Sequence, residues 1–195
     1  MLAQSLASSG TMSGMARVRG RDFVDAVAFV REEYGPGALE RVLAALTPET
    51  RAHFGGVIRE VEWYMLQDLD AYLKAACRVL DPGSLELCRR QGRFAAQRQK
   101  ADFLGPMVED PEMRIRMAPT TWRMFYDVGR LEVHGDSPET AVGRIHDFPA
   151  TPELCTRFLG IWEGIMSTPG MGAVAEEASC VRRGDPFCEI RVRYE

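Results

Sequence analysis

The chain has 195 residues, a formal net charge of −4 at pH 7 and 27% charged residues. This balance is ordinary for a globular protein and gives no global basic field of the kind that attracts nucleic acid. Its apolar runs fall short of the roughly 18–20 residues that a membrane span needs. We therefore expect no nucleic-acid partner, no membrane span and a cytoplasmic location.

The first 19 residues are rich in Ser, Gly, Ala and Met, and they lack the basic and apolar segments of a signal peptide. We expect a disordered leader over residues 1–19 and a single domain over residues 20–195. The five cysteines are an odd number without a secretion signal, which argues against a secreted disulfide scaffold.

Apolar residues recur at helical spacing through the first half of the chain. Cap and turn residues divide this half into predicted helices over 22–34, 38–46, 67–80 and 84–103. Thr47 and Pro48 start another short helix, since Thr is a good N-cap and Pro suits the first turn. A further helical stretch begins at Asp110, is restarted by Pro119 and ends at Gly129. Residues 57–63 have no clear assignment.

The periodicity changes after Gly129. Residues 130–135 and 140–148 alternate like two strands, a helix capped by Thr151 runs to about residue 167, and two strands follow over 172–181 and 187–194. The predicted fold class is α+β: N-terminal helices, then helix–strand–strand–helix–strand–strand, with an antiparallel sheet packed against helices.

The last two predicted strands form a hairpin that carries two cysteines. Gly184 lies midway between Cys180 and Cys188, so a symmetric hairpin places the thiols opposite each other, with Cβ atoms roughly 4.5–5.5 Å apart. That separation suits a shared metal ion or, with some adjustment, a disulfide. Beyond the turn the residues alternate strictly between the two faces of the predicted strand. One face packs on the core and carries Cys188, Ile190, Val192 and Tyr194, and the other faces solvent and carries Glu189, Arg191 and Arg193.

Cys155, in the first turn of the preceding helix, and Glu177 complete a candidate zinc set with Cys180 and Cys188. Thiolates are soft donors that suit a tetrahedral zinc site. The alternative is that these cysteines are simply buried, as free cysteines often are. Glu177 and Cys180 point to opposite faces of a regular strand unless a bulge intervenes, and Glu176 is the reserve ligand.

Catalytic signatures are missing from the sequence. It has no phosphate-binding loop, dinucleotide fingerprint, metalloprotease motif or nucleophile elbow. His53, His134 and His146 stand apart along the chain, and we interpret the last two as exposed residues of the first hairpin. We expect a protein that is not an enzyme and assign no catalytic residue.

Residues 152–164, the Glu177-x-x-Cys180 step and the segment from Gly184 to Cys188 resemble the 4-vinyl reductase domain, a small-molecule sensor module of bacterial regulators. The resemblance implies a metal bound by Cys155, Glu177, Cys180 and Cys188. The wider superfamily includes haem-dependent NO sensors and trafficking-complex subunits. From about Arg19 the chain resembles a bacterial branch of it, through segments like residues 63–65 and 122–129.

Haem-binding members of that superfamily use a helix histidine as axial ligand and a Tyr-x-Ser-x-Arg clamp for the propionates. The helix that bears Cys155 has no histidine, and the clamp motif does not occur. Zinc is therefore the expected cofactor, and haem is not expected.

The resulting hypothesis is a non-enzymatic sensing domain in bacterial signalling, with a structural zinc at the hairpin. Its ligand is a small apolar or aromatic molecule in a core pocket, although each candidate residue also suits an ordinary core: Trp122, Phe125, Tyr126, Phe158, Leu159 and Trp162. The alternative is a ligand-free protein–protein interaction module. Expected partners are a second copy or a signalling protein, docked on a final strand at the sheet edge through Arg182, Arg183, Arg191 and Arg193.

Overall fold

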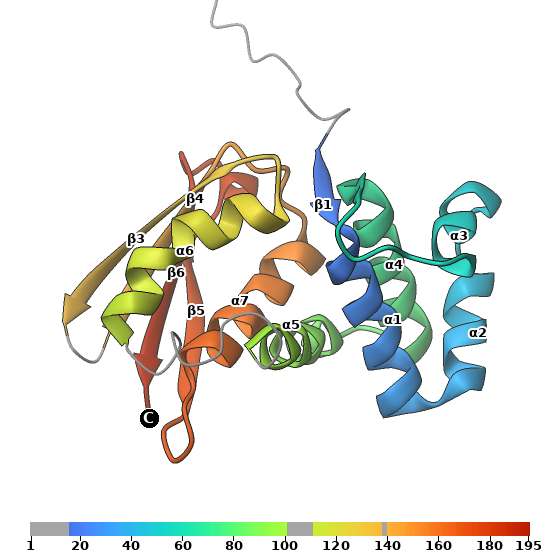
Figure 1. The fold of residues 1–195 in the computed structure, drawn as a ribbon, viewed down its shortest axis with the longest axis horizontal. Helices are drawn as coiled ribbons and strands as arrows, with labels where there is room; N and C mark the ends of the chain where they lie inside the picture. The colour runs from blue at the N-terminus through green and yellow to red at the C-terminus, as the bar shows by residue number, and fades with distance from the viewer. Residues whose placement is uncertain (1–15, 101–110, 138–139) are drawn as a thin grey trace, which may run out of the picture.

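The computed structural model describes residues 16–100, 111–137 and 140–195. Its first part is helical and its second part is a sheet with two helices, as the sequence predicts (Figure 1). The helical part comprises α1 (Gly20–Tyr34), α2 (Pro36–Ala44), α3 (Pro48–Gly55), α4 (Leu66–Leu80) and α5 (Glu86–Gln99). The α+β class is thus confirmed.

The second part places α6 (Pro111–Phe125) and α7 (Pro152–Met166) beside an antiparallel sheet (Figure 1). Its strands are β3 (Arg130–Ser137), β4 (Thr140–His146), β5 (Ala173–Ser179) and β6 (Cys188–Tyr194), and a 3-10 turn, η3 (Val181–Arg183), precedes β6. The strand order is β3-β4-β6-β5. The inward residues of β6 are buried, so the predicted alternation along that strand is confirmed for Cys188, Ile190 and Val192.

A small second sheet links the N-terminus to the loop after α3. β1 (Arg17–Arg19) pairs antiparallel with β2 (Trp63–Met65), and Val18 also bridges to Tyr126 at the end of α6. Residues 17–19 therefore belong to the folded domain, although the sequence placed them in the leader. The rest of the predicted leader, residues 1–15, lies outside the described residues.

Helix ends follow the capping residues read from the sequence. Thr47 Oγ1 accepts a hydrogen bond from the Thr50 amide at 3.3 Å, and Thr151 Oγ1 accepts one from the Leu154 amide at 3.2 Å. Each satisfies an amide that the first helical turn leaves without a partner. The predicted restart at Pro119 is wrong, because α6 runs through that residue.

Helices α5 and α7 cross at very short range because glycines form the contact. A Cβ atom at Gly160 would lie 1.9 Å from the Arg89 carbonyl oxygen, and one at Gly92 would lie 2.1 Å from the Arg157 carbonyl oxygen. Neither distance is possible for real atoms, so the two backbones touch where any larger residue would separate them. α5 thereby joins the helical part of the molecule, through α1, to α7 and the sheet (Figure 1).

A buried carboxylate reinforces this crossing. Glu163 on α7 accepts hydrogen bonds from Arg89 and Arg93 on α5 and from the Ala175 amide on β5. Burial alone would raise the pKa of Glu163, but its hydrogen bond with Arg89 and the other contacts lower it below the ordinary value. The carboxylate therefore stays ionised and fixes helix, helix and strand together.

The final strand is not a sheet edge. β6 lies between β4 and β5, so both its backbone edges are paired, and the edges of the sheet are β3 and β5. Its arginines also have carboxylate partners: Arg191 Nε donates to Glu189 at 3.0 Å, and Arg183 donates to Glu177 at 2.6 Å. The predicted docking surface on an open final strand is therefore wrong.

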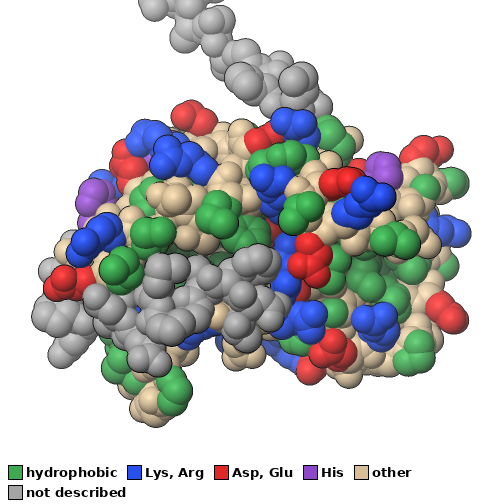
Figure 2. All heavy atoms as spheres, in the orientation of Figure 1, with side chains coloured by type: hydrophobic (Ala, Val, Ile, Leu, Met, Phe, Trp, Pro, Cys, Tyr) green, Lys and Arg blue, Asp and Glu red, His purple; other side chains and the backbone are tan. Residues whose placement is uncertain are grey.

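Charged side chains of both signs are interspersed over the face of the molecule seen in Figure 2. Mixed charge of this kind suits a solvated surface better than a nucleic-acid footprint. Within the described residues, none of the helices has the length and apolar character needed to cross a bilayer.

The glycine crossing generates a stability prediction. Gly160→Ala should lower the free energy of unfolding by about 3 kcal/mol, because the added methyl group forces α5 and α7 apart. Gly37→Ala is the matched control: it is also helical, and its Cβ would meet nothing within 4 Å. The control should change stability by less than about 1 kcal/mol. Equal denaturant midpoints for the two variants would contradict the crossing geometry.

Candidate functional site

A cavity of about 110 Å³ lies between α6 and α7. Leu131 on β3, Gln99 at the end of α5 and Asp22 on α1 contribute to its walls. Two polar residues of α6, Arg114 and Thr121, also line it. Most of the remaining lining is apolar and comes from the two helices: Met113, Ile115, Met117, Ala118, Ile161, Ile165 and Met166. The cavity thus sits where both parts of the fold meet.

Aromatic rings form one end of the cavity. Trp122 stacks on Tyr126 with ring centroids 4.5 Å apart, and Phe158 on α7 lies 5.4 Å from Trp122 and 5.6 Å from Tyr126. Phe148, after β4, contacts all three rings from outside the lining. Rings in these stacked and tilted arrangements offer flat apolar surfaces to a ligand.

The structure brings most of the predicted ligand-binding residues to this cavity. Its lining includes Trp122, Phe125, Tyr126, Phe158 and Trp162. Leu159 is not part of the lining; it is half-buried and packs against the core. The reason is helical geometry, since a residue next to Phe158 points about 100° away from it.

A fully buried arginine binds Asp22, one of the polar residues of the cavity wall. The Arg157 side chain is 0% exposed, and it donates to Gln91 at 2.6 Å, to the Tyr126 hydroxyl at 2.9 Å and to Asp22 Oδ1. Burial works against its charge, but the Asp22 carboxylate more than offsets this, so the pKa of Arg157 is raised. Asp22 and Arg157 therefore form a buried ion pair between α1 and α7.

Sequence reasoning missed this ion pair. The partners are separated by 135 positions, and nothing in the segment 152–164 marks Arg157 as one of a pair. The available signal was weak: Arg157 directly precedes Phe158 in a helix whose buried residues, apart from Glu163, are otherwise uncharged. A charged residue at such a position needs a buried partner, although the sequence does not say which.

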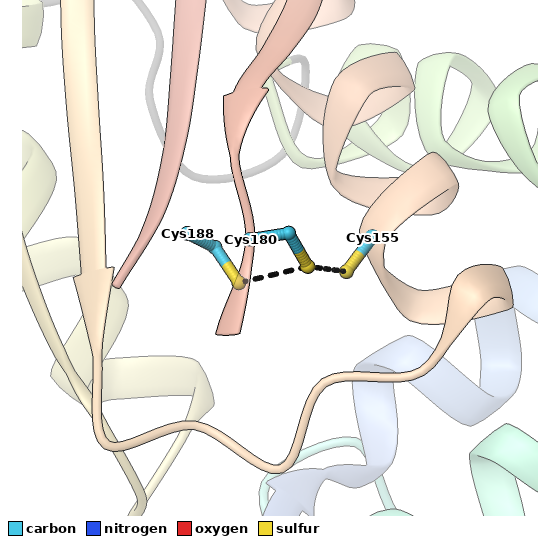
Figure 3. Close-up of side chains that lie close together, drawn as sticks. All are labelled: Cys155, Cys180 and Cys188. Carbon is cyan, nitrogen blue, oxygen red and sulfur yellow. Dashed lines mark hydrogen bonds between the residues drawn. The ribbon is translucent and has the colours of Figure 1, made fainter. Parts of the chain in front are cut away.

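Three cysteines meet near the N-terminal end of α7 (Figure 3). Cys180 Sγ lies 3.7 Å from Cys155 Sγ and 3.4 Å from Cys188 Sγ, and all three sulfur atoms lie within 4.8 Å of one another. Zinc–sulfur bonds of about 2.3 Å in a tetrahedron place sulfur atoms about 3.8 Å apart. The cluster therefore has the dimensions of a zinc-thiolate site.

The hairpin reaches this geometry through a bulge and a tight turn. The register of β5 against β6 shifts between Glu177 and Ser179, as the parity argument required. The Cys180 amide then donates to Asp185 Oδ2 at 2.7 Å, and Gly184 takes a positive φ of 90°. Glycine adopts that conformation without strain, which lets the chain turn back to Cys188.

The two candidate carboxylates differ in position. Glu177 lines a small cavity of about 10 Å³ together with Cys155 and Cys188, while its Oε2 accepts a hydrogen bond from Arg183. The Glu176 side chain is 57% exposed and lies 3.9 Å from Arg193. Glu177 therefore shares a cavity wall with two of the cysteines, but among the described residues the group whose ligand atoms lie within 4.8 Å of one another comprises the three cysteines without it. Glu176 is directed to solvent.

The three thiols differ in acidity. Hydrogen bonding with Cys155 lowers the pKa of Cys188 to about 6, and hydrogen bonding with Cys188 raises the pKa of Cys155. Burial raises the pKa of Cys180. Cys188 is thus the thiol of the cluster that loses its proton most readily, and thiolate is the form that binds metal.

The remaining cysteines and histidines are located elsewhere. Cys77 on α4 and Cys88 on α5 form a separate buried pair with sulfur atoms 3.0 Å apart, which the sequence gave no reason to expect. His53 is bonded to Asp68 at 2.8 Å, and His146 to Glu132 at 3.2 Å. None of these groups lines the α6–α7 cavity.

No protein-family model and no curated protein matches this chain. Solved structures of H-NOX domains match it over 91% of its length. An H-NOX protein mutant from K. algicida has a TM-score of 0.67, 10% identity and 96% of its own chain covered. The domain from Shewanella oneidensis, in the Fe(II)CO ligation state, has a TM-score of 0.70, 12% identity and 98% covered.

An oxygen-binding H-NOX domain related to soluble guanylate cyclases matches with a TM-score of 0.63 at 14% identity, and 95% of that chain is covered. At such low identity the likeness shows the fold, and this fold is that of H-NOX domains. It supports the haem-NO-binding part of the sequence resemblance. The likeness to the 4-vinyl reductase domain stays a prediction.

The expectation that haem is not a cofactor is contradicted by these matches. They include H-NOX domains from several organisms, and two of the matched structures concern heme distortion. The sequence argument relied on an axial histidine and a propionate clamp, but other side chains, methionine among them, also ligate haem iron. Haem is therefore a cofactor candidate for this fold.

The side of the aromatic cluster that borders the α6–α7 cavity leads to a prediction. Both Phe158→Ala and Phe23→Ala should lower the free energy of unfolding, and the loss should be smaller for Phe158→Ala by about 1 kcal/mol or more. The reason is that Phe158 already lacks packing partners on its cavity side. Phe23 is the matched control: it is a fully buried helical phenylalanine stacked on Phe54 with ring centroids 4.8 Å apart. Denaturant melts measure both values. Equal losses would mean that no ligand-sized space adjoins Phe158.

Proposed function

We propose that this chain is a non-enzymatic small-molecule sensing domain in signalling, which binds an apolar or aromatic ligand in the α6–α7 cavity. The observation that carries the proposal is the cavity itself, since it is lined by aromatic and aliphatic side chains with few polar groups. Such concave apolar sites are the usual places for small ligands. The same observation favours this function over a ligand-free interaction module.

The position of the cavity suits a sensor. It is bounded by α1, α5, α6, α7 and β3, so a ligand there contacts both the helical part and the sheet part of the fold. A ligand that binds one arrangement of these parts better than another shifts the population between them. The signal then passes to a second copy or a signalling partner, and a cytoplasmic location stays a prediction.

Haem is the second candidate ligand, supported by the haem-containing structures that share this fold. The lining matches such a group in its chemistry, while the cavity of about 110 Å³ would have to widen to admit a porphyrin. Trp122, Phe158 and Ile161 offer apolar surfaces for a porphyrin, and the Met113 and Met117 thioethers are donors of a type that ligates haem iron. When bound, haem supplies an iron that takes a diatomic gas.

A titration with toluene and with hemin tests the proposal. Trp122 and Trp162 line the cavity, so their fluorescence should respond to either ligand, and hemin adds its own absorbance band. Ala118→Leu, which fills the cavity, should weaken binding at least tenfold. Ala44→Leu, at an exposed position on α2, is the matched control. Absence of binding by both probes, or binding that Ala118→Leu leaves intact, would contradict the proposal.

We also propose that Cys155, Cys180 and Cys188 hold a structural zinc, with Glu177 as the fourth ligand. The support is the separation of the sulfur atoms and the placement of Glu177 beside two of the cysteines. To bind the metal, Glu177 exchanges its hydrogen bond with Arg183 for coordination. The ion would join the first turn of α7 to the β5–β6 hairpin, in addition to the contact between Glu163 and the Ala175 amide.

Elemental analysis tests the metal proposal. Protein purified without chelators should contain one zinc per chain, and Cys180→Ser should reduce that content at least tenfold. Cys77→Ser is the control, because its sulfur contacts Cys88 on another pair of helices. Acid should release the metal, since thiolates bind it only when deprotonated. If the wild-type protein contains no zinc and Cys180 and Cys188 form a disulfide, the metal proposal is wrong and the disulfide is what links the two ends of the hairpin.

A further inference from the structure

The polar end of the cavity contains an oxygen atom without a partner. Asp22 lines the cavity, its side chain is 1% exposed, and its Oδ1 is taken by Arg157. Its Oδ2 is buried and has no hydrogen-bond partner among the described residues. A buried acceptor left unpaired is costly, so an oxygen of this kind at a cavity wall indicates a missing donor.

The neighbouring groups determine the charge of that donor. Asp22 and Arg157 neutralise each other, and Arg114, the other charged residue of the cavity lining, contacts the Ile165 and Met166 carbonyl oxygens at the C-terminal end of α7. The end of the cavity at Asp22 therefore carries no net charge that a charged ligand would balance. A buried ion without a counter-ion is strongly disfavoured. The missing donor is therefore a neutral N–H or O–H group.

The nearest donor within the protein is the Tyr126 hydroxyl. Burial raises the pKa of Tyr126, and the Asp22 carboxylate raises it further, so the phenol keeps its proton. The hydroxyl oxygen already accepts a hydrogen bond from Arg157 at 2.9 Å. Tyr126 therefore competes with a ligand for Asp22, and a test has to separate the two.

We propose that Asp22 is the specificity-determining residue of the cavity and that its Oδ2 accepts a hydrogen bond from a neutral aromatic ligand bearing one N–H or O–H donor. The flat part of the ligand lies among Trp122, Phe158 and Trp162, and its donor faces Asp22. This inference rests on the proposed function, because it assumes that the cavity holds an aromatic ligand.

Indole and indene are the matched probes. They have nearly the same shape, but only indole has an N–H group. Calorimetric titration of the full chain should give a dissociation constant for indole that is roughly tenfold lower than for indene. In an apolar cavity without an acceptor the preference would reverse, because burying an unpaired N–H is unfavourable.

Variants then assign the preference to Asp22. Asp22→Asn should abolish it, because the side-chain amide presents N–H groups to the ligand's own N–H. Asp25→Asn, which removes a buried carboxylate one turn along α1 but outside the cavity lining, should retain it. Tyr126→Phe removes the competing donor and should leave the indole preference equal or larger.

Each outcome decides between the two proposals. Equal binding of indole and indene to the wild type overturns the role of Asp22 while the apolar cavity stands. Binding of neither probe overturns both. If Asp22→Asn fails to fold, the wild-type ratio and the Tyr126→Phe ratio still decide. If the preference for indole over indene disappears in Tyr126→Phe, the Tyr126 hydroxyl is the group that accepts the hydrogen bond from indole, and the role of Asp22 is overturned.

Discussion

The structure depends on one buried guanidinium group. Arg157 projects from α7 and is bound by Asp22 on α1, Gln91 on α5 and Tyr126 just after α6. A charge buried this completely is tolerated only with all its partners in place, and removing one partner from such a pair costs about 3–5 kcal/mol. Arg157 therefore fixes the relative positions of four elements, and the walls of the cavity follow from those positions.

The glycine crossing and the arginine act together. Because Gly92 and Gly160 let α5 and α7 touch, the Arg157 side chain can reach Gln91 on the facing helix. Phe158, Ile161 and Trp162 on α7 then line the cavity, while Cys155, in the first turn of the same helix, contacts the hairpin cysteines. A single helix thus carries a candidate metal site near its N-terminal end and a candidate ligand site farther along. Metal binding at the hairpin and ligand binding at the cavity would both act on the position of α7.

The parts of the structure that local sequence determines were predictable. The alternation of Ile190, Arg191, Val192 and Arg193 and the caps at Thr47 and Thr151 depend on neighbouring residues, and the structure has them where the sequence puts them. Glu189, which the sequence places on the wet face, is instead buried, because Arg144 and Arg191 pair with its carboxylate. The close approach of the three cysteines followed from a hairpin and a packed helix. The absence of the haem motifs did not decide against haem, because side chains other than histidine also ligate haem iron.

Long-range pairing was not predictable in the same way. Nothing within β6 indicates that it lies between β4 and β5, since strand order depends on contacts between distant segments. Likewise, β1 is too short to identify without its partner at Trp63–Met65, and Arg157 gives no sign of pairing with Asp22. The cavity is a consequence of these distant contacts. It could be anticipated from aromatic residues alone only as a list of candidates.

Crystallography under xenon pressure tests the central claim most directly, because xenon enters apolar cavities without needing any particular chemistry. The account predicts a xenon atom among the side chains of Trp122, Phe158 and Ile161, between α6 and α7. A structure in which these side chains close on one another and exclude xenon would contradict it.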